Sequence, residues 1–291
     1  MNIENRTILI TGANRGIGGA LVDEALRRGA KKVYAGTRKT FRHGDRRVTP
    51  VALDVTSDSQ IRQAAQAIEE VDVLVNNAGI ALYDDLSSLE AIEQQLAVNF
   101  FGSLKMSQAF LPVLKRSRGA IVNCLSLAAL APLPIIPAYS ISKAAAASMT
   151  QSLRLLLTGQ GVTVHAVFLG PIDTDMNRGL DIPKASPESA AMGILDGLQR
   201  GEEDIFPDPA SGPIAGSFRS GIAKDGRALH WQAMIWDHAS NWDEEDVRAM
   251  LAFLRVLPPV RRAIPAPRPP AADDCEVYTF WVAASATPGC R

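Results

Sequence analysis

The chain has 291 residues, of which 47% are hydrophobic and 21% are charged, and its formal net charge is -1. This balance is ordinary for a globular protein and argues against nucleic acid or an anionic membrane as a partner. No run approaches the roughly 18 apolar residues of a membrane-spanning helix, and the first residues lack a secretory signal pattern. The three cysteines, Cys124, Cys275 and Cys290, lack the spacing of metal ligands and leave one unpaired, so we expect a cytoplasmic protein without a metal site.

Up to about residue 209, short apolar segments rich in β-branched residues alternate with segments whose apolar residues recur at helical spacing. This alternation predicts an α/β protein with a parallel sheet covered by helices on both faces. We therefore predict a Rossmann-type, doubly wound sheet of seven strands in a domain spanning residues 1–209. The predicted strands are Thr7–Thr11, Lys32–Gly36, Pro50–Val55, Val71–Asn76, Ala120–Leu125, Thr163–Leu169 and Glu203–Pro207. The predicted helices are Gly18–Arg28, Ser59–Glu70, Leu89–Lys115, Tyr139–Thr158 and Pro187–Arg200.

The composition changes after about residue 210, where Trp231, Trp236 and Trp242 fall close together. A helix is predicted over residues 243–257, with acids in its first turn and Pro258 and Pro259 ending it. The prolines that follow favour an extended, poorly packed chain. Residues 210–291 are therefore predicted to form a C-terminal extension that is partly helical and partly Pro-rich.

The first predicted strand, Thr7–Thr11, leads directly into a turn that contains Gly12, Gly16 and Gly18. Glycines at such a strand-to-helix turn let the backbone approach a pyrophosphate, and the following helix N-terminus offers free N–H groups to it. A glycine turn without a ligand is the simpler alternative, but its position after the first strand favours a dinucleotide site. The same turn supplies three further candidate contacts, which are Asn14, Arg15 and Ile17.

The end of the second predicted strand indicates which dinucleotide is bound. NAD enzymes usually carry an acid there for the ribose 2′-hydroxyl, whereas this chain has Thr37 and Arg38. Arg38, together with Arg15 in the glycine turn, can pair with a 2′-phosphate, which a carboxylate would repel. We therefore predict NADP(H), with NAD(H) as the alternative, although each arginine alone could be a solvated surface residue.

The fourth predicted strand ends in Asn76 and Asn77, followed by Ala78 and Gly79. Two amides and a glycine at a strand end suit a backbone that must approach the adenosine side of a cofactor. The same asparagine pair could also simply form a turn. We include Asn77, Ala78 and Gly79 among the candidate cofactor contacts.

Tyr139 and Lys143 lie four residues apart in a strongly helical segment, so they share one helix face. A tyrosine with its ordinary pKa near 10 is a poor proton donor or acceptor at neutral pH, and a nearby cation favours its phenolate. The lysine can also hold the ribose of a cofactor. Ser126, at the end of the fifth predicted strand, could donate a hydrogen bond to a substrate oxygen where charge develops. On spacing alone, Tyr139 and Lys143 could be two half-exposed side chains.

Four motifs occur in the order typical of one enzyme family. The glycine turn Thr11–Gly18 has the form T-G-x-x-x-G-x-G, and Tyr139 and Lys143 have the form Y-x-x-x-K. Ser126 lies 13 residues before the tyrosine, and Asn99 begins an N-x-x-G sequence after the fourth predicted strand. Over about the first 209 residues the chain therefore resembles the short-chain dehydrogenase/reductase family.

The resemblance implies an oxidoreductase that interconverts a carbonyl and a secondary alcohol by hydride transfer with NADP(H). It implies that Tyr139 is the general acid/base and that Ser126 orients the substrate oxygen. Lys143 would lower the pKa of Tyr139, and Asn99 would hold a water in the proton relay. The family also places an acid that contacts adenine at Asp54, beside Val55, although Asp54 could instead cap the next helix.

The segment after the sixth predicted strand, LGPIDTDM, resembles the P-G-x-x-x-T segment that surrounds the nicotinamide in this family. The resemblance assigns contacts with the nicotinamide carboxamide to Pro171, Ile172 and Thr174. The stretch NRGLDIPKASPES takes the position of the family's mobile substrate lid. Apolar Ile182, Met192 and Ile194 in this region favour a neutral small-molecule substrate.

Two features concern assembly and the tail. Relatives of this fold pair through long helices, here Leu89–Lys115 and Tyr139–Thr158, which implies a homodimer or homotetramer. The tail resembles the end of a c-type cytochrome, with Met234 at the place of a haem ligand, yet the chain has no C-x-x-C-H motif and we expect no haem. The tail is either a fused cytochrome fragment or a lineage-specific extension.

Two alternatives to an active enzyme follow from these features. The chain could bind NADPH as a sensor without turnover, or it could be an inactive fusion product whose tail impairs catalysis. A sensor would not need the tyrosine–lysine pair, so the complete set of motifs favours the enzyme.

Overall fold

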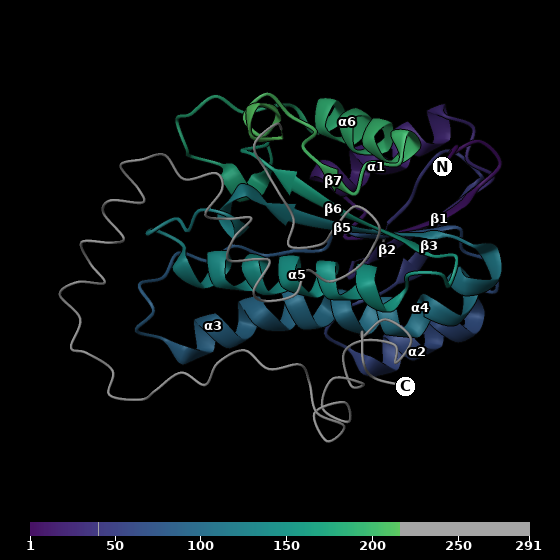
Figure 1. The fold of residues 1–291 in the computed structure, drawn as a ribbon, viewed down its shortest axis with the longest axis horizontal. Helices are drawn as coiled ribbons and strands as arrows, with labels where there is room; N and C mark the ends of the chain where they lie inside the picture. Colours follow the sequence, from purple (N-terminus) through teal and green to yellow (C-terminus); the bar gives the residue numbers. More distant parts are fainter. Residues whose placement is uncertain (40, 216–291) are drawn as a thin grey trace, which may run out of the picture. The chain divides into compact units, whose positions relative to one another are not determined.

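The computed structural model describes residues 1–39 and 41–215. Their strands form one parallel sheet in the order β3-β2-β1-β4-β5-β6-β7 (Figure 1). The prediction of a seven-stranded, doubly wound parallel sheet is confirmed. The strands are β1 (Thr7–Thr11), β2 (Lys32–Thr37), β3 (Val48–Ala52), β4 (Val73–Asn76), β5 (Ala120–Ser126), β6 (Thr163–Leu169) and β7 (Asp204–Ile205). β1 pairs with both β2 and β4, so the strand order reverses there, and such a switch point is where open α/β sheets bind ligands.

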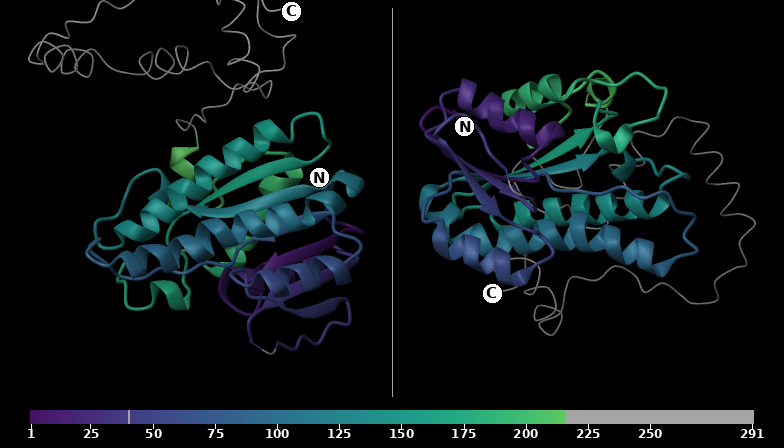
Figure 2. Two further views of the ribbon diagram at one scale, coloured as in Figure 1. Left: turned by 90° about the horizontal axis from the view of Figure 1, so that it is seen from below. Right: turned by 180° about the vertical axis from the view of Figure 1, so that it is seen from behind.

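Helices cover both faces of the sheet (Figures 1 and 2). Two of them, α1 (Gly16–Arg27) and α6 (Pro187–Arg200), lie together on one face. The opposite face is covered by α2 (Asp58–Ala67), α3 (Leu89–Leu96), α4 (Ser103–Ser117) and α5 (Pro137–Leu156). The sheet is therefore buried on both sides, as its continuous apolar strands require.

Serine residues determine where three of these helices begin. Ser57, Ser88 and Ser186 each precede a helix, and each side chain accepts a hydrogen bond from a backbone N–H of the first turn. This is the ordinary capping role of serine, which satisfies a donor that the helix itself leaves free. At its other end α6 stops at Gly201, which has a left-handed φ of 74°.

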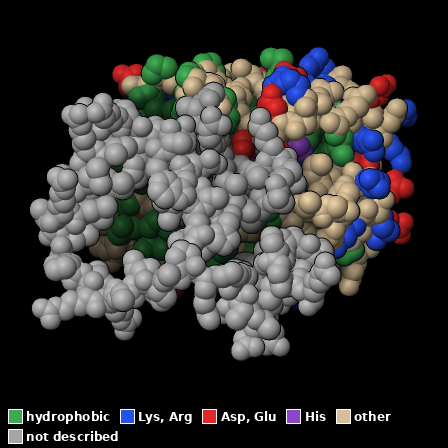
Figure 3. All heavy atoms as spheres, in the orientation of Figure 1, with side chains coloured by type: hydrophobic (Ala, Val, Ile, Leu, Met, Phe, Trp, Pro, Cys, Tyr) green, Lys and Arg blue, Asp and Glu red, His purple; other side chains and the backbone are tan. Residues whose placement is uncertain are grey.

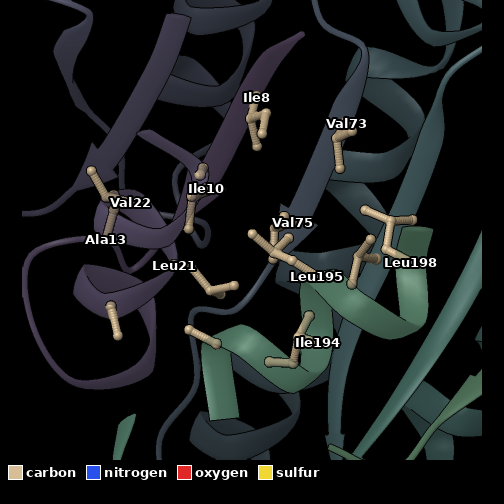
Figure 4. Packing of buried hydrophobic residues seen from close by; sticks show 14 of the residues in the cluster. Ile8, Ile10, Ala13, Leu21, Val22, Val73, Val75, Ile194, Leu195 and Leu198 are labelled. Atoms are coloured by element: carbon tan, nitrogen blue, oxygen red, sulfur yellow. The ribbon is translucent and has the colours of Figure 1, made fainter. Parts of the chain in front are cut away.

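The strand β1 divides the hydrophobic core into two layers. Ile8 and Ile10 point toward α1 and α6, where they lie in one cluster with Leu21 and Leu195 (Figure 4). Leu9, between them in sequence, belongs instead to the cluster on the α2 and α4 side. Alternate residues of a strand point to opposite faces, so each face of β1 is packed by a different pair of helices.

Ile194 belongs to the first of these core clusters and is fully buried (Figure 4). The expectation that it helps to form a substrate lid is therefore wrong. Helical spacing turns this position of α6 toward the sheet. Ile182 and Met192, the other two apolar side chains assigned to that region, are 45% and 46% exposed.

The segment predicted as one helix, Leu89–Lys115, is interrupted. A π-helical segment, η1 (Ala97–Gly102), separates α3 from α4 and carries Asn99. Gly102 lies so close to Val55 that a Cβ at this position would come within 2.7 Å of its side chain. The irregular turn lets the start of α4 approach the end of the third strand, a contact that helical periodicity does not reveal.

The third strand also differs from its prediction, since it spans Val48–Ala52 instead of Pro50–Val55. It pairs with β2 from Val33 opposite Val48 to Thr37 opposite Ala52. The last contact is the Leu53 N–H, which donates to the Thr37 carbonyl at 2.9 Å just where β2 ends. The strand limits are thus decided by pairing.

The predicted domain boundary at residue 209 stays a prediction. Asp208, Ala210 and Ser211 form a turn in which the Asp208 carboxylate accepts the backbone N–H of Gly170 at 2.9 Å, just after β6. The predicted helix over residues 243–257, Met234 and the cytochrome-like segment lie outside the described residues.

Within residues 1–39 and 41–215, no helix is both long and apolar enough to cross a membrane. On the face seen in Figure 3, Lys and Arg side chains are interspersed with Asp and Glu along the right-hand side. Such charges form ion pairs in the described structure, as between Arg6 and Asp72 at 3.0 Å. This visible surface is therefore mixed in charge.

Candidate active site

A pocket of about 900 Å³ lies at the carboxyl ends of the strands and includes the ends of β1 and β4. Most of the predicted cofactor contacts line it, although they come from segments far apart in the sequence. These are Gly12, Asn14, Arg15, Gly16, Ile17, Gly18, Thr37, Arg38, Asp54, Val55, Asn77, Ala78, Gly79 and Thr174. The fold therefore brings together the glycine turn, the ends of the next strands and the segment after β6.

The glycine turn has a backbone that no other residue could adopt without change. Gly12 has a left-handed φ of 65°, and a Cβ on Gly18 would lie 2.2 Å from the Gly12 carbonyl oxygen. The Asn77 amide donates to the carbonyls of Thr11 and Gly12 at 2.9 and 3.3 Å. At the start of α1, Arg15 provides no side-chain cap. The first-turn N–H groups therefore have no side-chain cap.

Cations gather where the second strand ends. Arg38 and Lys39 are both exposed and both line the pocket. Lys39 was not among the predicted cofactor contacts. Its positive charge could attract a 2′-phosphate in the same way as that of its neighbour Arg38. Arg15, in contrast, forms an ion pair with Asp175, which also pairs with Arg178.

Asp54 forms a turn before α2 and does not cap the helix. Its Oδ1 accepts the backbone N–H of Thr56 at 2.9 Å and the Thr56 hydroxyl at 2.7 Å, whereas Ser57 caps α2. Burial acts to raise the pKa of Asp54, but the bonds from Thr56 and the nearby Arg38 outweigh it, so the pKa lies below its ordinary value. Asp54 is therefore ionised at neutral pH and lies at the pocket wall.

Ser126, Tyr139 and Lys143 are not among the lining residues of this pocket, but the Lys143 Nζ approaches it at Gly79, where a Cβ would lie 3.6 Å away. Ser126 ends β5, and its Oγ accepts the backbone N–H of Ala128 at 3.1 Å. Tyr139 is 9% exposed and hydrogen-bonds to Ser126. The Lys143 Nζ lies 5.7 Å from the centre of the tyrosine ring and donates to the Cys124 carbonyl at 2.8 Å. The three side chains therefore form one polar group in which Tyr139 and Lys143 are buried and Ser126 is half-buried.

The pKa values of this group are dominated by burial. Burial raises the pKa of Tyr139 above 10, and the hydrogen bond with Ser126 offsets only part of this rise. Burial also lowers the pKa of Lys143 to about 8. Burial therefore sets the net direction of the Tyr139 pKa in this structure, and the expected lowering of that pKa by Lys143 stays a prediction.

Asn99 holds the loop after β4 with its side chain. Its Oδ1 accepts the N–H of Ile80, and its Nδ2 donates to the Ile80 carbonyl and to Ser142 Oγ, each at 2.9 Å. A Cβ on Gly79 would lie 3.3 Å from Asn99 Oδ1 and 3.6 Å from Lys143 Nζ. Asn99 and Lys143 are thus brought together around a glycine backbone.

Only one of the three residues predicted to bind the cofactor in the segment after β6 lines the pocket. Thr174 lines the pocket, whereas Pro171 and Ile172 are not among its lining residues. Ile172 is 2% exposed, and its carbonyl accepts hydrogen bonds from Thr174 and Asn177. The other lining residues that the sequence analysis missed are Leu53, Ile80, Val98, Asp173, Asp175, Met176 and Pro187. Leu53 directly follows β3, and four others lie in the loops after β4 and β6, so their position after a strand end was the available signal.

Comparison with known proteins identifies the family. The family model for short chain dehydrogenases matches residues 6–184, which is more than half of the chain. The chain belongs to the short-chain dehydrogenase family. The short-chain dehydrogenase ptmH of Penicillium ochrochloron is 38% identical over 184 residues, covering 59% of this chain and 68% of the fungal protein.

Two solved structures of short-chain dehydrogenases and reductases share the fold. One is a short-chain dehydrogenase from Burkholderia cenocepacia in complex with NADP, with 39% identity and a TM-score of 0.71. The match covers 80% of this chain and 99% of that chain. The other is an NADPH-bound carbonyl reductase from chicken fatty liver, with 28% identity and a TM-score of 0.60 over 65% of this chain and 85% of that one.

Gly18→Ala is expected to abolish tight dinucleotide binding by this short-chain dehydrogenase, because its Cβ would overlap the Gly12 carbonyl oxygen. We expect the Kd for NADPH, measured by fluorescence titration, to rise about tenfold or more. Gly19→Ala is the matched control, since its Cβ would have no neighbour closer than 3.8 Å. Equal affinities of the two variants would contradict the assignment of this turn.

Lys143→Met is expected to stabilise the protein at neutral pH. Because the pKa of Lys143 is lowered to about 8 on folding, the unfolded chain binds the proton more tightly. The native state is therefore penalised below pH 8, and the penalty fades as the pH rises toward the ordinary lysine value.

Urea unfolding between pH 6.5 and about pH 9.5 measures this difference. We expect Lys143→Met to exceed the wild-type free energy of unfolding by on the order of 1–2 kcal/mol at pH 7, with a smaller gap at high pH. Lys39→Met, at an exposed position, is the control for replacing a lysine by methionine. Parallel curves for wild type and Lys143→Met would refute the lowered pKa.

Proposed function

We propose that this short-chain dehydrogenase uses NADP(H) to interconvert a carbonyl compound and a secondary alcohol, with Tyr139 as general acid/base. The observation that carries the proposal is the buried Tyr139 hydroxyl, hydrogen-bonded to Ser126 and close to the Lys143 ammonium, beside a pocket at the carboxyl edge of the sheet. This combination provides a proton donor, an oxygen-binding group and a cofactor pocket at one edge.

The pocket residues fit a dinucleotide. The glycine turn leaves room for a phosphate against the backbone at Gly12 and Gly18, and the uncapped start of α1 offers N–H groups to it. Asn77 and Asp54 lie on the pocket wall where the adenosine portion would bind. No side chain would have to leave the glycine turn for a pyrophosphate to approach.

NADP(H) is favoured over NAD(H) by charge. Arg38 and Lys39 line the pocket at the end of β2, where an acid would bind the 2′-hydroxyl of NAD. Two exposed cations at this position attract a 2′-phosphate through charge-assisted hydrogen bonds. The relatives from Burkholderia cenocepacia and chicken are described with NADP and NADPH. NAD(H) is the alternative.

When bound, NADPH supplies the hydride to the carbonyl carbon. Tyr139 donates its phenolic proton to the carbonyl oxygen, so that the carbonyl gains a hydride and a proton and becomes a secondary alcohol. The Ser126 hydroxyl holds that oxygen while charge develops on it. The raised pKa keeps Tyr139 protonated at neutral pH, as a proton donor must be. The Lys143 ammonium stabilises the phenolate that remains until solvent returns the proton, and it would also hold the cofactor ribose.

The surroundings of Ser126 favour a neutral substrate. Residues 127–136, which follow it, contain no charged side chain. Leu130, Leu133 and Ile135 in this stretch are 39%, 44% and 55% exposed. A charged substrate would find no counter-ion along this stretch.

Arg38→Asp tests the cofactor preference. The substitution places a carboxylate where the 2′-phosphate would bind, so we expect the Kd for NADPH to rise roughly 10- to 100-fold and the Kd for NADH to fall. Arg42→Asp is the matched control, because Arg42 is exposed in the same loop and does not line the pocket. If both variants lose NADPH equally, general charge and not the Arg38 site determines binding.

Tyr139→Phe tests the chemistry on a panel of aldehydes and ketones with NADPH. We expect kcat/KM to fall by on the order of 10²- to 10⁴-fold, the usual contribution of a general acid, while NADPH still binds. The control Tyr83→Phe alters a tyrosine that is 70% exposed and should retain activity. Wild-type protein that binds NADPH but turns over no member of the panel would favour the sensor, and an unaltered rate in Tyr139→Phe would rule out the proposed acid.

A further inference from the structure

Asp84, in the loop between β4 and α3, contacts the helix that carries Tyr139. Both oxygens of its carboxylate lie 3.3 Å from the backbone nitrogen of Ala138, which donates to them. Ala138 directly precedes Tyr139 in the first turn of α5 and is fully buried. A loop after the fourth strand thus reaches the start of the helix that follows the fifth.

The helix α5 has no cap of its own at this end. Ile136 occupies the capping position without a side-chain hydrogen bond, and Pro137 has no N–H to donate. The Ala138 N–H is therefore the first donor of the helix that needs a partner. Asp84 supplies that partner from outside the helix, and its negative charge suits a helix N-terminus.

Two further contacts hold Asp84 in place. The fully buried Gln95 of α3 accepts the N–H of Leu82 at 3.1 Å and donates to Asp84 Oδ2 at 3.4 Å. Asp84 Oδ1 also accepts the N–H of Leu86 at 3.2 Å. Leu86 has a left-handed φ of 66°, which is unusual for a leucine. The loop is therefore held in an unfavourable backbone conformation that keeps the carboxylate on α5.

The residue after Tyr139 is fixed as well. Ser140 is 2% exposed, and its Oγ accepts the N–H of Leu133 at 3.0 Å, from the loop after β5. Tyr139 thus lies between two residues that are each bound to a different loop. Movement of either loop would move the first turn of α5 and the phenol with it.

We propose that Asp84 is a positioning residue for Tyr139, which it keeps buried and within reach of Ser126 by fixing the first turn of α5. The inference rests on the proposed role of Tyr139, because positioning matters only if that phenol transfers the proton. Asp84 itself touches neither the reacting oxygen nor the cofactor pocket. It acts through the helix.

The neighbouring Asp85 provides a matched control. Its carboxylate accepts the N–H of Ser87 at 3.0 Å, the same local turn that Asp84 makes with Leu86, and its side chain is exposed. The two aspartates therefore differ in the bonds to α5 and to Gln95, which only Asp84 makes. Asp84→Ala and Asp85→Ala remove the same atoms from the same loop, and Asp84→Asn retains an acceptor oxygen for Ala138.

The experiment measures the ionisation of Tyr139 and the exchange of the α5 amides in the full chain. Tyrosinate absorbance is titrated for each variant and for the same variant carrying Tyr139→Phe, so that the difference reports Tyr139 alone. In wild type, Tyr139 should titrate above the ordinary tyrosine value because it is buried. In Asp84→Ala, water reaches the phenol and the titration should move to lower pH.

Hydrogen exchange of the amides of residues 138–143 should quicken about fivefold to tenfold in Asp84→Ala, as expected for the loss of one helix cap. Asp85→Ala should match wild type in both measurements, and Asp84→Asn should restore most of the wild-type behaviour. If Asp84→Ala does not fold, Asp84→Ser serves instead, because its shorter side chain withdraws the acceptor from Ala138. Identical titration and exchange in the Asp84 and Asp85 variants would overturn the proposal.

With a substrate from the carbonyl panel, Asp84→Ala should lower kcat about tenfold while the Kd for NADPH stays within about twofold, since the cofactor pocket is untouched. Rescue of kcat by Asp84→Asn distinguishes positioning from a general loss of stability. Failure of the proposed function would appear separately, as an unchanged rate in Tyr139→Phe, because the titration and exchange readouts need no turnover.

Discussion

The site depends on a hydrogen-bonded junction between β1 and β4. The Thr11 hydroxyl is buried, accepts the N–H groups of Asn77 and Ala78 at 3.0 Å each, and donates to the Val75 carbonyl at 3.3 Å. This one side chain replaces the strand pairing that is lost where the two strands diverge. Without it, the backbone at the switch point would be left unpaired or hydrated. The glycine turn and the asparagine loop therefore contact each other directly and together form part of the pocket wall.

The second constraint is the burial of charge. Tyr139 and Lys143 are placed in a low-dielectric layer between β5 and α5, where desolvation raises the tyrosine pKa and lowers the lysine pKa to about 8. A buried ammonium reduces stability unless it is compensated, and here a backbone carbonyl compensates only part of the cost. Proteins retain such destabilising groups mainly at functional sites. The rigid sheet and the loops bound to α5 keep the pair from relaxing into solvent.

The parts of the site that follow from local chemistry were predictable, and those that depend on pairing were not. The glycine turn, the end of β2 with Arg38 and the Tyr139–Lys143 pair were each indicated by neighbours in sequence. Gln95 and Asp84 gave no such signal, because an amide on a helix and an acid in a loop are usually solvated. Their partners, Leu82 and Ala138, are backbone groups, which a sequence does not distinguish.

The sequence by itself determined the family, the alternation of strands and helices, and which side chains could do chemistry, because periodicity and motif spacing are local properties of the chain. Only the tertiary structure decided where β3 ends, that a π-helical turn interrupts the helix at Asn99, and that Ile194 lies in the core. It also decided the protonation preferences of Tyr139 and Lys143. All of these features depend on contacts between segments that are distant in the sequence. Such contacts exist only once the strands have paired and the helices have packed on the sheet.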